Sequence, residues 1–414
     1  MGQYTLSQIK AAETLSFDDD DFEERLREIA KQFRGFDEAL TEFITEHGYT
    51  GDASDVNVKA QFLREKFRAA GIRLPRDFKE WFVPVKNLDR DTLFQICFAF
   101  RLNVDETEDF FRRIYCARGF DCHTIKEAVY YFCIKNHRTY ADAKQIIEQI
   151  PNYSKVKKLP EPGKIRYTGT IIHDIDSLTD EEKLIQYIAS NIDSFRYNNA
   201  TASKYIQDLW HSISDSGGLA EREVHILKRW NYCEEDLENR AVVDADTSTW
   251  AVFSQILGLS KGTEKEYAVK YDRSLHSAFS NNNLMPLKAA YCFPNRQNID
   301  KICRGELVGD DEVMRKMLIL LVFYKYWAKI SIDSGGKWLD DYQDDETALK
   351  KSPDSDRCLY VINSRLLDAG YPILYAGNPY DWIFMWSLNN YNPLEAFRTY
   401  IGEVFTELPS QNQA

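Results

Sequence analysis

Apolar residues recur at helical spacing along most of the chain, and no long stretch alternates between apolar and polar positions. Phe22, Leu26, Ile29 and Phe33 follow a period near 3.6 and precede Gly35, which indicates an amphipathic helix ending there. Similar patterns predict further helices, among them 37–47, 58–70, 124–136, 140–149, 202–213 and 221–230. The sequence therefore predicts an all-α, multi-helical fold.

Proline, glycine and charge divide this helical pattern into segments. Residues 151–168 contain three prolines, a glycine and a local basic excess, which is typical of a linker. Thr179 to Glu182 has the pattern of a capping box that opens a helix. We expect N-terminal helices at 1–71, a first module at 72–150, the linker, a helical middle domain at 169–290, and a second module at 291–414 with an acidic surface loop at 340–356.

The two modules share a layout. A shift of 221 residues places Leu93 on Met314, and a shift of 254 places Tyr130 on Phe384. The difference of 33 falls where the second module carries its acidic loop. This pattern predicts an internal duplication. The alternative is that any two arrays of amphipathic helices align equally well.

The first half of each module resembles the lambda-repressor type of helix-turn-helix. The strings are PNRQNIDKICRG before GDDEVMRKMLILLVF, and LPRDFKEWF before LDRDTLFQICFAF. The resemblance implies that Ile299 and Ile302 hold a recognition helix against the core. Lys86 and Arg90 would lie toward the DNA backbone. Outward residues would contact base edges or phosphates, namely Arg76, Lys79, Arg296, Gln297, Asn298, Lys301 and Arg304.

This resemblance leaves the partner open. Neither copy is preceded by the helix pair with a Gln-Ala-type turn, so a module that docks to protein is an alternative to one that binds DNA. The following string, RGFDCHTIKEAVYYFCIKN, is similar to strings in uncharacterised Firmicutes proteins. That similarity implies a bacterial protein, with a mobile-element or defence locus as a possible context, and no particular activity.

Arg118 and His123 have the Arg-x4-His spacing of HEPN-type ribonucleases, which this segment resembles. In that family both residues lie on one helical face, and the resemblance implies RNA cleavage. Gly119 and the polar residues before Thr124 instead place His123 at the start of a helix. A structural role for His123 is the favoured interpretation, and the nuclease remains the alternative.

Two groups of residues have metal-ligand chemistry. Cys116, Cys122 and His123 have the chemistry of zinc ligands. A structural zinc site needs four ligands, usually in CxxC-like pairs, and the sequence has no second pair to complete this group. The carboxylates of Asp174, Asp176 and Asp180 could suit a divalent ion, but the simpler interpretation places them in a solvated loop before a helix. No phosphate-binding loop, nucleophile elbow or dinucleotide fingerprint occurs. We expect no metal and no cofactor. The two groups are Cys116, Cys122 and His123, and His173, Asp174, Asp176 and Asp180.

Charge and cysteine content narrow the function classes. The net charge of -13 opposes non-specific nucleic-acid binding unless one face is basic. Eight cysteines without a CxxC, and no signal peptide, favour a reducing, cytoplasmic compartment. The longest apolar run, Met317 to Tyr324, is too short for a bilayer, so we expect no membrane association.

These observations favour a non-catalytic regulatory or interaction protein that docks to a protein or DNA partner. Two alternatives stay open. One is an adaptor or inhibitor whose acidic surface binds a basic protein, and the other is the RNase that uses Arg118 and His123. The sequence does not predict the oligomeric state.

Overall fold

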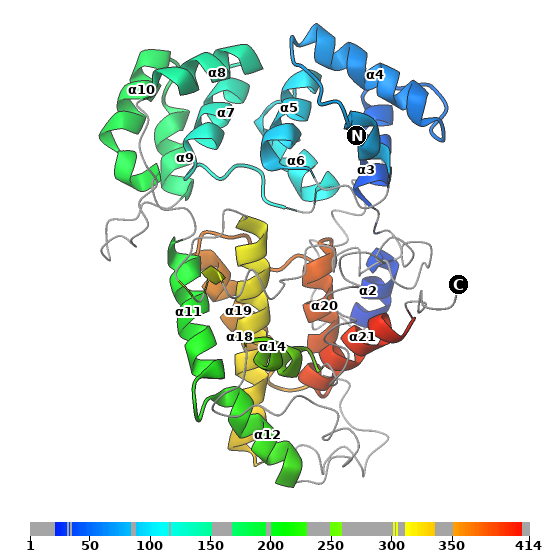
Figure 1. Cartoon of the computed structure of the whole chain (residues 1–414), viewed down its shortest axis with the longest axis vertical. Helices are drawn as coiled ribbons and strands as arrows, with labels where there is room; N and C mark the ends of the chain where they lie inside the picture. Colours follow the sequence, from blue (N-terminus) through cyan, green and yellow to red (C-terminus); the bar gives the residue numbers. More distant parts are fainter. Residues whose placement is uncertain are drawn as a thin grey trace. The chain divides into compact units, whose positions relative to one another are not determined.

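A computed structural model describes residues 21–30, 33, 35–83, 88–115, 117–150, 168–195, 200–229, 249–258, 301–302, 304, 311–335 and 351–407. Every regular element in these ranges is a helix, as the sequence predicted (Figure 1). The elements are α2 (Phe22–Ala30), α3 (Phe36–Glu46), α4 (Val56–Ala69), η1 (Phe78–Phe82), α5 (Arg90–Phe100), α6 (Val104–Ile114), α7 (Ile125–Lys135), α8 (Tyr140–Gln149), α9 (Thr168–Asp176), α10 (Glu181–Ser190), η2 (Ile192–Phe195), α11 (Ala200–Ser214), α12 (Leu219–Arg229), α14 (Thr249–Leu257), α18 (Asp311–Asp333), α19 (Ser355–Asp368), α20 (Pro379–Leu388) and α21 (Pro393–Glu407). None of these helices is long and apolar enough to cross a membrane.

The helices form two compact units, each with its own core. The first unit contains α3 to η2, and the second contains α2 together with α11 to α21. The segment 1–71, expected to form one N-terminal group of helices, is thus divided between the units. α2 joins the second unit because its apolar side packs on α20, where the indole Nε1 of Trp382 donates to the carbonyl of Leu26 at 2.8 Å.

The core of the first unit is built around α5 and α7. Phe94 on α5 is fully buried and contacts the rings of Phe111, Phe120 and Tyr130 at 4.7 to 5.2 Å between centroids. On α7 every residue from Glu127 to Ile134 is buried. The aromatic density of this stretch therefore belongs to the packed interior, where rings also gain edge-to-face contacts.

The core of the second unit is built around α18, the 23-residue helix coloured yellow in Figure 1. Its run from Met317 to Tyr324 is buried, and α12, α19 and α21 pack against it. A helix that is apolar on all sides must be covered on all sides, which explains its central place.

Two local expectations were wrong. Residues 173–176, expected in a solvated loop, end α9 because Ile171 and Ile175 are fully buried and that helix packs on α7. The next helix is capped by Asp180, which accepts the backbone N–H groups of Glu182 and Lys183, and not by Thr179.

Several expectations fall outside the described residues. They are most of the linker at 151–168, the acidic segment 340–350, and the residues Lys86, Cys116, Arg296, Gln297, Asn298 and Ile299.

Candidate functional site

A buried ion pair ties α5 to α7 in the first unit. Arg90 makes a two-point contact with Glu127, with Nε–Oε1 and Nη2–Oε2 both at 2.7 Å. Arg90 also donates to the carbonyls of Arg118, at 3.1 Å, and Gly119. The second oxygen of Glu127 accepts the backbone N–H of Asp121 at 2.6 Å. The pair therefore fixes the loop before α7. The sequence suggested that Arg90 lies toward a DNA backbone, but its side chain is engaged within the unit.

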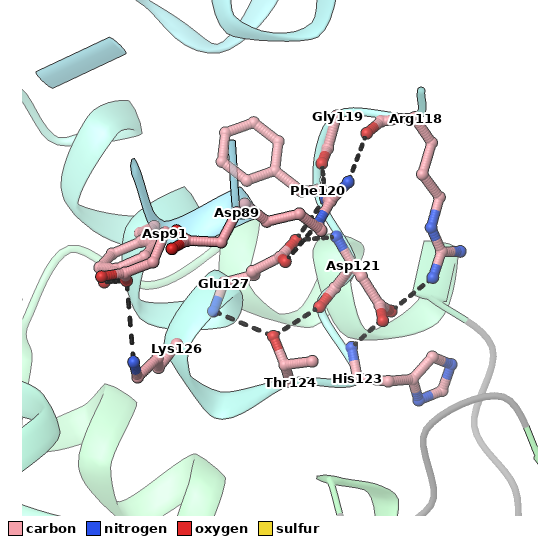
Figure 2. A network of polar contacts seen from close by, with 12 residues as sticks. Asp89, Asp91, Arg118, Gly119, Phe120, Asp121, His123, Thr124, Lys126 and Glu127 are labelled. Carbon is pink, nitrogen blue, oxygen red and sulfur yellow. Dashed lines mark hydrogen bonds and ion pairs between the residues drawn. The ribbon is translucent and has the colours of Figure 1, made fainter. Parts of the chain in front are cut away.

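The same loop carries the residues proposed for RNA cleavage. Figure 2 shows Arg118 paired with Asp121, at 2.8 Å, and His123 beside Thr124 at the start of α7. Thr124 is the N-cap of α7, so His123 precedes the helix. The side chains of Arg118 and Asp121 are 11% and 4% exposed. Nδ1 of His123 lies 3.2 Å from the carbonyl of Ser194. Arg118 and His123 therefore share a loop and not a helical face.

Burial and charge set the protonation of this loop. Burial alone would raise the pKa of Asp121, but the guanidinium of Arg118, with His123 and Arg90, holds it below the ordinary value. Burial lowers the pKa of His123 more than Asp121 raises it. Asp121 is thus ionised and His123 neutral near pH 7. Burial raises the thiol pKa of Cys122 well above its usual range, so this cysteine is neither a thiolate nor a ready metal ligand.

A second buried ion pair ties α18 to α20 in the second unit. Arg315 contacts both oxygens of Asp381, at 2.7 and 2.6 Å, and the two side chains are 4% and 0% exposed. Arg315 also donates to the carbonyls of Pro372 and Ile373, each at 3.4 Å. Asp381 accepts the backbone N–H of Tyr375 at 3.0 Å.

The α5–α7 and α18–α20 ion pairs have the same layout. In each, the acid is the third residue of its helix and accepts an N–H from six positions earlier. In each, the arginine donates to the carbonyls eight and nine positions before the acid. Glu127 and Asp381 are 254 positions apart, the shift found in the sequence for this half.

For the first helix of each pair, the contacts match at a shift that differs from the 221 positions expected from the sequence. Arg90 and Arg315 are 225 positions apart, one helical turn beyond the shift of 221. The ring pair Phe98–Tyr130 and the ring pair Phe323–Phe384 are spaced in the same way, both edge to face. Since the run Met317–Tyr324 of α18 is apolar on all sides, shifting the alignment by one turn barely changes the hydrophobic pattern there, and the sequence could not distinguish the two alignments.

The loops that precede the two acids differ in side chains. Where the first unit has Arg118, Asp121 and His123, the second has Pro372, Tyr375 and Gly377. The backbone contacts recur while these side chains do not.

A group of exposed basic residues lies on α4 and the segment that follows it. We call it the basic surface; it consists of Arg64, Arg68, Arg73, Arg76 and Lys79, all exposed. From Val56 to Val83 the chain has seven basic and three acidic residues, against a net charge of -13 overall. Lys59 also belongs to this segment but is buried under the ring of Phe82 and is not part of the surface.

The basic surface borders a shallow depression of about 360 Å³. Its lining is Arg64, Phe67, Arg68, Gly71, Ile72, Arg73 and Leu74, with no acidic residue among them. Within the described ranges, no carboxylate pairs with Arg68, Arg73 or Arg76. Lys79 donates to the side-chain oxygen of Asn57 at 2.9 Å, a neutral partner that leaves its charge uncompensated.

The remaining predicted site residues are scattered. Lys301 and Arg304 are exposed next to the buried Ile302, but their neighbours on the proposed recognition helix lie outside the described part of the chain. Among described residues, no group of three or more His, Cys, Asp or Glu side chains could hold a metal ion.

Of the five residues of the basic surface, Arg76 and Lys79 were among the predicted site residues, and Arg64, Arg68 and Arg73 were not. The signal was present: a window over 64–79 has a positive balance in an otherwise acidic chain. No family model, curated protein or solved structure matches this chain.

Proposed function

We propose that this chain is a non-catalytic regulatory or interaction protein that docks to an anionic partner, either DNA or an acidic protein surface. The observation that carries the proposal is the basic surface. Five exposed cations gather on one short segment of a strongly acidic chain, and none of them pairs with a carboxylate of the described residues; Arg64 and Lys79 donate only to the neutral Gln61 and Asn57. Like charges that are not neutralised within the fold repel one another, and a complementary partner relieves that repulsion.

We further propose that the two modules arose by internal duplication. The matched ion pairs and their matched spacings support this origin. Contacts that recur in both copies serve what the copies share, which is the fold. Arg90 and Glu127 are then structural, and the loop at 118–123 owes its shape to them.

The loop is also poorly suited to nuclease chemistry. A guanidinium that stabilises a transferring phosphoryl group must be available to it, whereas Arg118 is largely buried and paired with Asp121 at 2.8 Å. We therefore prefer the docking function to the RNase alternative.

The cysteines support a reducing compartment such as the cytoplasm, which we propose as the location. Cys97, Cys122, Cys133 and Cys358 are free and buried.

Retention on a heparin column at pH 7.5 tests the docking function. An acidic protein without a basic face should pass through, whereas the parent chain should be retained and elute with salt. The triple variant Arg64→Gln, Arg73→Gln and Arg76→Gln should lose retention. Flow-through of the folded parent protein would contradict the proposal.

A matched control separates a local surface from overall charge. The triple variant Lys183→Gln, Lys204→Gln and Arg222→Gln removes three exposed positive charges from α10, α11 and α12. It changes the net charge equally and should elute with the parent. Equal losses in both variants would mean that no particular surface is responsible.

A further inference from the structure

We infer that the basic surface binds the sugar–phosphate backbone of duplex DNA and does not read base sequence. This inference rests on the proposed docking function and selects DNA as the partner. It assigns Arg64, Arg68 and Arg73 as the phosphate-binding residues beside the depression.

The geometry of the depression suits phosphate groups. Arg64 and Arg68 are one helical turn apart on α4, and Arg73 follows a turn at Gly71, whose φ of +69° suits glycine. The three side chains surround a floor that includes the buried Phe67 and Ile72. A guanidinium donates two parallel hydrogen bonds to one phosphate, and no acidic side chain lines the depression to compete for it.

The dipole of α4 explains part of the positive charge in this segment but not all of it. Cations in the last turn of a helix are stabilised by its dipole, and this accounts for Lys66 and Arg68 in α4. Arg73, Arg76 and Lys79 lie beyond the end of α4, so the dipole does not account for them. Two exposed acidic residues, Asp77 and Glu80, lie in the same stretch, so its positive balance is small, and this remaining charge is what a partner would complement.

The same segment is unsuited to reading bases. η1 is a five-residue 3-10 helix, which spans about 10 Å and offers little to insert into a major groove. Its aromatic residues Phe78, Trp81 and Phe82 are buried, as is Phe67 of α4. Single-strand binding relies on exposed rings that stack on bases, and these rings are not available. The mode of binding that these residues do suit is contact with the sugar–phosphate backbone of a duplex.

The expected salt dependence is large. Three phosphate contacts give a slope of log K against log salt of about -2.7, so affinity should fall roughly 40-fold between 50 and 200 mM salt. Affinity should be similar for duplexes of unrelated sequence because phosphate contacts carry no sequence information.

The experiment is a fluorescence anisotropy titration of the full chain with two labelled 24-base-pair DNA duplexes of unrelated sequence, over 50–200 mM salt. The triple variant Arg64→Gln, Arg73→Gln and Arg76→Gln removes two of the three assigned phosphate contacts, so it should bind more weakly and make the slope shallower by about 1.8. The control Lys183→Gln, Lys204→Gln and Arg222→Gln should match the parent. Circular dichroism establishes that both variants are folded, which is expected because all six side chains are exposed.

The outcomes separate the two proposals. Heparin retention without duplex binding overturns the DNA assignment and leaves an acidic protein as the partner. Failure of both assays overturns the docking function as well. A strong preference for one duplex sequence, or an unchanged slope in the first triple variant, contradicts backbone binding by these arginines.

Discussion

Removal of Asp381 tests whether the buried ion pairs hold the fold. In Asp381→Ala, Arg315 would keep its charge with 4% of its side chain exposed and would lose its closer carboxylate, leaving only Glu312, whose Oε1 lies 3.9 Å from Nη1. The N–H of Tyr375 would also lose its acceptor. Removing one partner of a buried pair costs about 3–5 kcal/mol when the remaining charge has no compensation. Because Glu312 still lies 3.9 Å from Arg315, we expect a loss toward the lower end of that range. That is a large part of the stability of a typical domain.

The α5–α7 ion pair provides the comparison. Arg90 and Glu127 are 21% and 9% exposed, so water can partly solvate the arginine that Glu127→Ala leaves behind. We expect a smaller loss for Glu127→Ala than for Asp381→Ala. Replacing both partners in the double variant Arg315→Met and Asp381→Leu should recover much of the loss, since no unpaired charge remains.

Hydrogen exchange with mass spectrometry is the appropriate assay, because two units need not unfold in one transition. Protection should fall in α18 and α20 for Asp381→Ala, and in α5 and α7 for Glu127→Ala. A loss below about 1 kcal/mol in Asp381→Ala would refute the reasoning, since it would put the buried pair on the scale of an exposed one. A larger loss of stability in the double variant Arg315→Met and Asp381→Leu than in Asp381→Ala would also refute the reasoning.

Two further predictions concern a glycine and a carboxylate. Gly258→Ala should destabilise the second unit by about 1–3 kcal/mol, measured by thermal unfolding, because φ is +69° and an added Cβ would lie 2.7 Å from Cγ of Arg398. The control Gly217→Ala has a similar φ of +73° but open space around the added Cβ, so it should destabilise the protein less. Equal losses of stability in the two variants would contradict a steric cause. Because the pKa of Asp121 is held below its ordinary value of 3.8, its stabilisation is present above that pH and is lost as pH falls through the lower, folded-state pKa. Asp121→Asn should therefore flatten the acid limb of stability against pH, measured by urea unfolding from pH 2 to 7, and an unchanged limb would rule out this contribution.

Local signals predicted helices well where a cap and an apolar period coincide. α8 was expected at 140–149 and runs from Tyr140 to Gln149, because Thr139 and Asp142 form a capping box at its start. The shift of 221 differs by one helical turn from the 225 positions that separate Arg90 from Arg315, because the run Met317–Tyr324 is apolar on all sides and its pattern fits either alignment. Asp180 and Thr179 are adjacent and both capable of capping, so only the structure distinguished them.

The basic surface was determined by the sequence itself. Its residues lie within 16 positions of one another, and α4 and η1 follow from local periodicity, so exposed cations could be counted before any fold was known. The ion pairs were decided only by the tertiary structure. Glu127 is 37 positions from Arg90, Asp381 is 66 from Arg315, and Trp382 is 356 from Leu26. Contacts over such separations depend on how whole helices pack against one another. Helical periodicity indicates which face of a helix is buried, but it does not indicate which other helix covers that face.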